Sequence, residues 1–113
     1  MFNKILVPLD GSSASEMVLP YAEEIAAKFN AETVLVTVSE PAPTDTDHLF
    51  RYYLEHVRTQ VQHELQERGA REEIKVSSEI LGGAPADAIL SYADENNVEL
   101  IAMTSRGRSK RGP

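Results

Sequence analysis

Short apolar runs alternate with longer amphipathic stretches along the chain. Four runs are rich in β-branched residues and short enough to be buried strands, near residues 4–9, 33–39, 75–81 and 99–103. Between them, apolar residues recur at the three- and four-residue spacing of a helix. Strands that alternate with helices predict a parallel sheet with right-handed crossovers and helices packed on its faces.

Local signals predict where the helices begin and end. Ser13 followed by Glu16 has the form of a capping box and predicts the first helix start. Pro20 lies inside this helical pattern and predicts a bend or a later start, because proline has no N–H. Pro85 is expected in the first turn of the third helix. The expected buried faces are Val18, Tyr21, Ala22, Ile25, Ala26 and Phe29, then Phe50, Tyr53, Leu54, Val57, Val61 and Leu65, then Ala86, Ile89, Leu90 and Ala93.

The element order predicts one α/β domain over residues 1–113, with a doubly wound, open, Rossmann-like parallel sheet. In chain numbering, the expected strand order is 3-2-1-4. A fourth parallel strand normally leads into another helix that covers it, and only ten residues follow Met103. We therefore expect the chain to be C-terminally incomplete.

Charge is spread unevenly along the sequence. The formal net charge is −7, yet the last eight residues carry four cations, Arg106, Arg108, Lys110 and Arg111. The acidic remainder argues against nucleic-acid binding. The basic end favours a small anion such as a phosphate, although a solubilising tail explains it as well.

Several classes of protein are disfavoured. The chain has no cysteine, which excludes disulfides and Cys-ligated metals. It has no apolar run long enough to cross a membrane and no signal-peptide pattern, so we expect a cytoplasmic protein without membrane contact. The spacing of His48, His56 and His63 does not suit zinc, and we expect no metal site. P-loop, GxGxxG and GxSxG motifs are absent, which disfavours the corresponding enzymes.

A ligand cleft is expected where the winding of the sheet reverses, at the carboxyl ends of the first and fourth strands. There, Pro8–Gly11 should face Met103–Gly107. Asp10 is placed either to accept a hydrogen bond from a ribose hydroxyl or adenine amino group, or to form an Asx turn that caps the next helix. Residues 104–112 combine glycines, hydroxyls and cations, which suits a phosphate cradle but also an unstructured terminus.

The motifs Ile5–Ser12, Val34–Val38, Gly83–Pro85 and Ile101–Ser109 resemble those of the universal stress protein family. The similarity covers the whole chain in order. It implies a parallel sheet with strand order 3-2-1-4-5, of which this chain lacks the fifth strand. In this family that strand commonly builds the homodimer.

The resemblance also implies a ligand, ATP or another adenine nucleotide, with or without magnesium. Asp10 would meet the ribose or adenine, Val38 would pack on the adenine, and the loop after the fourth strand would open the phosphate site. The implied nucleotide-binding residues are Pro8, Leu9, Asp10, Val38, Met103, Thr104, Ser105, Arg106 and Gly107. Thr104 stands where the family pattern has a glycine, and the last glycine of that loop would fall beyond Pro113.

The function implied by this resemblance is adenine-nucleotide binding in a homodimeric stress-response or regulatory protein that is not an enzyme. The alternative is a homodimeric stress-protein module that acts without a nucleotide. An enzyme of the wider adenine-nucleotide α-hydrolase group is disfavoured, because the SGGxDS-type loop is absent after the first strand.

Overall fold

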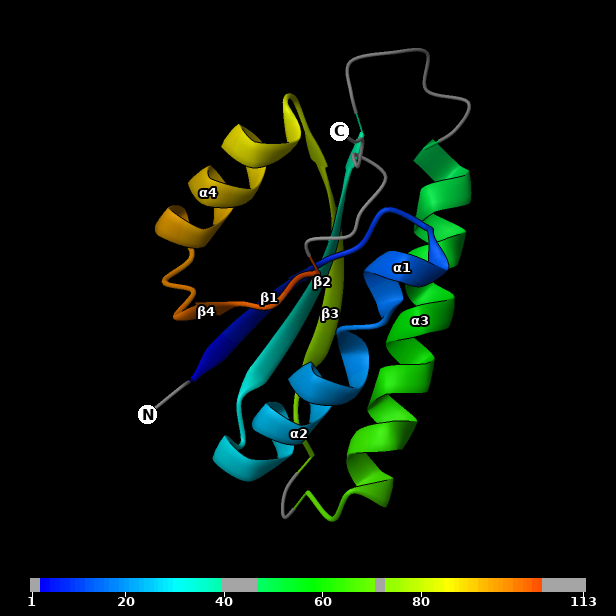
Figure 1. The fold of residues 1–113 in the computed structure, drawn as a ribbon, viewed down its shortest axis with the longest axis vertical. Coiled ribbons are helices and arrows are strands. Elements are labelled where there is room, and N and C mark those ends of the chain that lie inside the picture. Colours follow the sequence, from blue (N-terminus) through cyan, green and yellow to red (C-terminus); the bar gives the residue numbers. More distant parts are fainter. Residues whose placement is uncertain (1–2, 40–46, 71–72, 105–113) are drawn as a thin grey trace, which may run out of the picture.

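The computed structural model describes residues 3–39, 47–70 and 73–104, and it confirms the predicted parallel sheet (Figure 1). The strand order is β3-β2-β1-β4, as the alternation of elements predicts. The elements are β1 (Lys4–Pro8), α1 (Ser13–Glu16), α2 (Leu19–Phe29), β2 (Glu32–Ser39), α3 (Asp47–Glu67), β3 (Val76–Gly82), α4 (Pro85–Glu95) and β4 (Leu100–Ile101).

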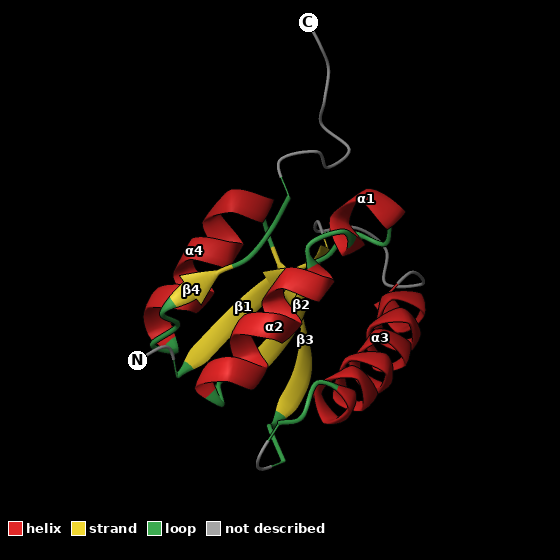
Figure 2. Ribbon diagram, turned by 60° about the horizontal axis from the view of Figure 1, so that its bottom comes forward, coloured by secondary structure: helices red, strands yellow, loops and turns green. Residues whose placement is uncertain are grey.

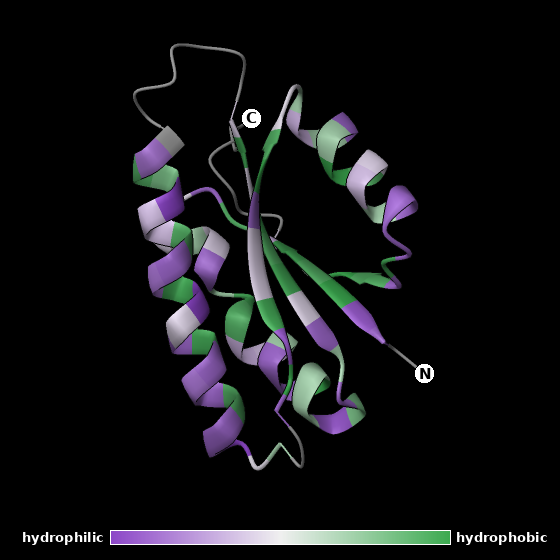
Figure 3. Ribbon diagram, turned by 180° about the vertical axis from the view of Figure 1, so that it is seen from behind, coloured by the Kyte–Doolittle hydropathy of each residue, from purple (hydrophilic) through white to green (hydrophobic). Residues whose placement is uncertain are grey.

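Helices cover both faces of the sheet, α2 and α3 on one side and α4 on the other (Figure 2). Side chains alternate along β1, so that Ile5 and Val7 join the α2/α3 core while Leu6 joins the α4 core. Figure 3 shows the apolar residues concentrated on the central strands, with many polar residues on α3. None of the described helices is long and apolar enough to cross a membrane.

Strand β4 is shorter than the predicted 99–103. Only Leu100 and Ile101 are in register with β1, although the amide of Ala102 still donates to the carbonyl of Leu6 at 2.9 Å. In a parallel ladder, the next bond on this side of β1 would need an N–H from Pro8, which proline lacks. The ladder therefore ends where Pro8 begins to face β4.

The start of the first helix lies one residue before its predicted place. Ser12, not Ser13, is the N-cap, and its Oγ accepts from the amide of Ser15 at 3.1 Å. Pro20 shifts the helix start as expected, because α1 ends at Glu16 and α2 begins with Pro20 in its first turn. Pro85 likewise opens α4.

The predicted buried face is confirmed for most of α3, where Phe50 and Tyr53 are half-buried, and it is wrong in part for the other helices. Leu54, Val57, Val61 and Leu65 of α3 are all 1% exposed. On α4, Ile89 is buried but Ala86 is exposed and Leu90 is 61% exposed. Leu90 lies about 100° around the helix from Ile89, and a single helix on this face turns only one narrow stripe to the sheet. On α2, Tyr21 and Phe29 are exposed in the same way.

A buried carboxylate on α2 gives a testable pH dependence. Glu23 is 6% exposed, and burial raises the pKa of its carboxyl above 4.5 despite the opposing charge of Arg68, whose Nε lies 3.4 Å away. The native state then holds a proton that the unfolded chain releases, so this group lowers stability as pH rises from 4.5 through the raised pKa. We expect Glu23→Gln to reduce this loss in urea unfolding series across pH.

Glu24→Gln is the matched control for this prediction. Glu24 is the next residue on α2 and also pairs with Arg68, at 3.5 Å, but its side chain is 75% exposed. The control variant should keep the wild-type pH dependence. An unchanged pH slope in Glu23→Gln would contradict the assignment to Glu23.

Candidate functional site

The turn after β1 is closed by hydrogen bonds around Asp10. Its Oδ1 accepts from the amide of Ser12 at 2.9 Å and from the Ser12 hydroxyl at 2.6 Å. The amide of Asp10 donates to Ser15 Oγ at 3.2 Å. The Asx turn, one of the two roles open to Asp10 from sequence, is therefore formed. The side chain remains exposed at the carboxyl edge of the sheet.

The neighbouring ends of β1 and β2 are fixed from both faces. The amide of Leu9 donates to the carbonyl of Val36 at 2.8 Å, and Thr37 Oγ1 donates to the carbonyl of Leu9 at 3.0 Å. Leu9 is 3% exposed and packs in the α2/α3 core. Val38 is half-buried and packs against the α4 core, and strand alternation places Pro8 on that same face.

The chain after β4 returns to α1. Thr104 Oγ1 donates to the carbonyl of Ala14 at 3.3 Å, so the segment after β4 lies against the helix that follows Asp10. Met103 is 53% exposed beside it. Six of the expected ligand residues are thus placed at one edge of the sheet, while Ser105, Arg106 and Gly107 lie outside the described residues.

Tyr53 of α3 reaches this edge as well. Its hydroxyl donates to Glu16 Oε2 at the end of α1. Burial, then the hydrogen bond and charge of Glu16, then the charge of Asp10 raise the pKa of Tyr53, so the phenol stays protonated as a donor. The sequence pattern places Tyr53 only on the apolar stripe of α3, and no sequence signal points to this contact.

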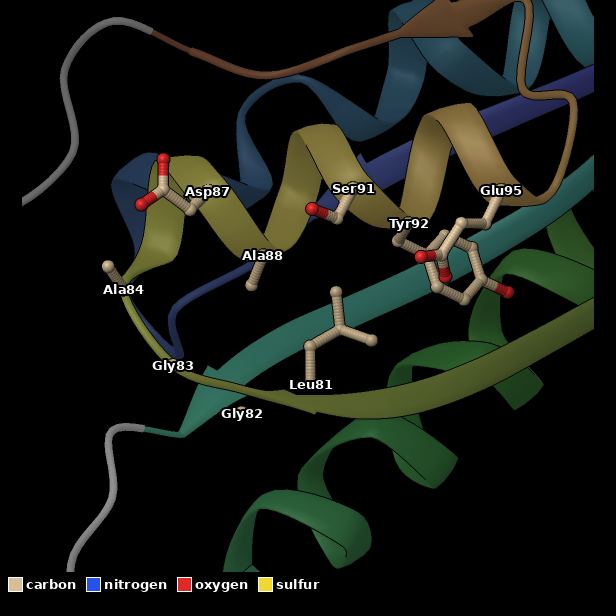
Figure 4. Close-up of a pocket in the computed structure, with 9 residues that line it drawn as sticks. All are labelled: Leu81, Gly82, Gly83, Ala84, Asp87, Ala88, Ser91, Tyr92 and Glu95. Carbon is tan, nitrogen blue, oxygen red and sulfur yellow. The ribbon is translucent and has the colours of Figure 1, made fainter.

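A surface hollow of about 310 Å³ lies elsewhere, between the end of β3 and α4 (Figure 4). Asp87, Ser91 and Glu95 follow one another along the side of α4 that faces it. It is lined by Leu81, Gly82, Gly83, Ala84, Asp87, Ala88, Ser91, Tyr92 and Glu95.

This hollow does not suit the phosphates of a nucleotide. Two carboxylates and no cation are among its lining residues, so it repels anions. No sequence motif predicts this hollow. Gly83 has a φ of +110°, a backbone conformation that favours glycine, and makes the turn from β3 to α4 that borders the hollow.

The histidines of α3 stand at its surface. His48, His56 and His63 are all exposed, and His63 Nε2 lies 3.6 Å from Glu67 Oε2. Within the described ranges, no three His, Asp or Glu side chains lie close enough to hold a metal ion.

The sequence of this chain is similar to a known protein family over nearly its whole length. The model of the universal stress protein family matches residues 1–112. Universal stress protein YxiE of Bacillus subtilis (strain 168) is 31% identical in an alignment 122 residues long, gaps included, that covers 96% of this chain and 82% of that protein.

Solved structures share the fold. A universal stress protein in complex with cAMP aligns with a TM-score of 0.68 at 24% identity, covering 96% of this chain and 77% of that chain. A universal stress protein family protein from Arabidopsis thaliana with AMP bound aligns with a TM-score of 0.60 at 18% identity, covering 96% and 79%.

Proposed function

Because this chain belongs to the universal stress protein family, we propose that it binds an adenine nucleotide and acts in a stress response through that binding, not as an enzyme. The site we propose is the sheet edge where β1 and β4 end. ATP is the nucleotide we favour. The residues proposed to contact it are Pro8, Leu9, Asp10, Val38, Met103, Thr104, Ser105, Arg106 and Gly107.

One observation carries this proposal. Asp10 stands exposed at the carboxyl end of β1, and Thr104 Oγ1 bonds to Ala14 of the adjoining helix at 3.3 Å, which draws the segment after β4 toward Asp10. This is the switch point of the sheet, where α/β proteins of this kind bind ligands. An exposed carboxylate there suits a ribose hydroxyl or an adenine amino group as donor.

The relatives of known structure narrow the ligand class. One holds cAMP and another holds AMP, and the two ligands share the adenosine portion and differ in the form of the phosphate. We therefore propose that recognition rests on the base and ribose, with Val38 and Pro8 offering apolar surface on the α4 face. The phosphate is assigned to the segment that begins at Met103.

We propose that any magnesium ion enters the site bound to the phosphates of ATP. It usually binds through one or two carboxylates together with phosphate oxygens. Asp10 offers a single carboxylate, and its Oδ1 already accepts two hydrogen bonds from Ser12. The described residues therefore suit a nucleotide-borne ion better than a protein-built magnesium site.

A second candidate is a homodimeric stress-protein module that works without a nucleotide. It is favoured by the Asx turn, because that turn alone gives Asp10 a structural role. In both cases we propose a homodimer in the cytoplasm.

Nucleotide titration of the purified protein decides between the two candidates. We expect calorimetry to show saturable binding of ATP, AMP and cAMP, with guanine nucleotides weaker by about tenfold, or about 1.4 kcal/mol. ATP titrated with and without magnesium tests whether the ion contributes. Absence of heat with every adenine nucleotide, in a sample that light scattering shows to be a dimer, would favour the second candidate.

A further inference from the structure

The geometry at α1 points to a further residue of the proposed nucleotide site. We propose that Tyr53 is a positioning residue, which fixes α1 through Glu16 and thereby sets the loops after β1 and β4. This inference rests on the proposed function. It means that α3 influences nucleotide affinity, although no ligand contact is predicted on this helix.

Helix α1 is too short to be stable by its own hydrogen bonds. It comprises four residues, Ser13–Glu16, and one turn of helix is not stable in isolation. Its first turn is capped by Ser12, and the chain turns again at Met17 before α2 begins. Its position must therefore come from tertiary contacts.

Both loops of the proposed site are bonded to this short helix or its cap. Asp10 Oδ1 accepts from Ser12, the N-cap of α1. Thr104 Oγ1 donates to the carbonyl of Ala14 inside it. A shift of α1 would consequently move both the carboxylate and the start of the phosphate segment.

Tyr53 links α1 to α3, a helix with a well-buried face. Its neighbour Leu54 is 1% exposed, and the same stripe of α3 continues in the buried residues Val57, Val61 and Leu65. From that stripe the Tyr53 hydroxyl reaches Glu16 Oε2, the last residue of α1. The views of the fold agree that α1 lies beside α3 (Figures 1 and 2). The hydrogen bond thus joins α1, which is too short to be stable alone, to the well-packed helix α3.

Tyr53→Phe removes this bond and keeps the ring. We expect it to weaken ATP binding in calorimetry by about fivefold to tenfold, since hydrogen bonds to charged groups contribute more than neutral ones. Tyr92→Phe is the matched control, because Tyr92 also donates to a glutamate, Glu79, at 3.4 Å, but beside the β3/α4 hollow. The control should bind ATP as the wild type does. Equal affinity of Tyr53→Phe and wild type would overturn the inference.

Two further variants separate positioning from general stability. Glu16→Gln keeps an acceptor for the hydroxyl and should retain most of the affinity, whereas Glu16→Ala should lose as much as Tyr53→Phe. Combining Tyr53→Phe with Asp10→Ala should weaken binding by less than the product of the two single losses, because part of the Tyr53 effect acts through the Asp10 turn. Losses that multiply in the double variant would assign Tyr53 to general stability and contradict positioning.

Hydrogen exchange without nucleotide gives a readout that does not depend on binding. Tyr53→Phe should speed exchange at the amides of Ser15 and Glu16, while Tyr92→Phe should not. If the wild type binds no nucleotide but this exchange difference appears, the proposed function fails and the link from Tyr53 to α1 stands. If exchange at these amides is unchanged, the link itself is wrong.

Discussion

Replacing Leu54 by alanine is expected to lower the free energy of unfolding by about 2–5 kcal/mol. Leu54 is 1% exposed and packs in the α2/α3 core, so its removal leaves a cavity between helix and sheet. Urea unfolding followed by circular dichroism measures this loss as a lower midpoint at an unchanged slope.

Leu49→Ala provides the matched control on the same helix. Leu49 is 59% exposed, and its truncation should change the free energy of unfolding by less than about 1 kcal/mol. The two substitutions are chemically identical, so any difference between them reports burial and not helix propensity. Similar losses in both variants would mean that α3 does not pack as described.

Asp10→Ala is expected to weaken ATP binding by about 1–3 kcal/mol, or roughly 5- to 150-fold, because the polar groups of the ligand would lose their partner. The same substitution removes two hydrogen bonds from Ser12. Calorimetry of Asp10→Asn tells the two effects apart, since asparagine keeps an acceptor for Ser12 and the Asx turn. We expect this variant to retain stability and lose only part of the affinity.

Asp87→Ala controls for the loss of one negative charge at this edge of the sheet. Asp87 lies in the first turn of α4 and lines the hollow at the end of β3. Its removal should leave ATP affinity unchanged or slightly raise it. Wild-type affinity in Asp10→Ala would assign Asp10 to the turn alone.

The sheet was predictable because its strands are apolar on both faces. Residues such as Leu6 and Val7 are buried on opposite sides of β1, which produces a continuous apolar run instead of an alternating one. The right-handed crossover rule then limits the strand orders that need to be considered. The end of β4 was not predictable in the same way, since it depends on which side of β1 Pro8 faces.

The buried faces of the helices were predicted less well. The spacing of apolar residues locates an apolar stripe but does not show how much of its width is buried. Leu90 and Tyr21 fit the spacing of buried residues, yet both are exposed, 61% and 72%. Whether such a residue is covered depends on the neighbouring elements. The stripe of α3 was predicted correctly because α3 lies against both the sheet and α2.

The candidate site was likewise predictable only in part. Asp10 and Thr104 were predicted as candidates from their place at strand ends, which the sheet topology brings to one edge. The contact of Tyr53 with Glu16 was not predicted, because it joins two helices through residues distant in sequence and follows no motif. Side-chain contacts between separate elements require the fold before they can be inferred.

The position of β1 between β2 and β4 has a consequence for how the chain folds. Its pairing with β2 closes a short loop, Ile5 with Thr33, whereas its pairing with β4 joins Ile5 to Leu100. Closing the longer loop loses more chain entropy, and β4 leaves the ribosome after β1, β2 and β3. The sheet should therefore assemble as β1, β2 and β3 first. During synthesis, the edge of β1 that later receives β4 stays unpaired until β4 itself has been made.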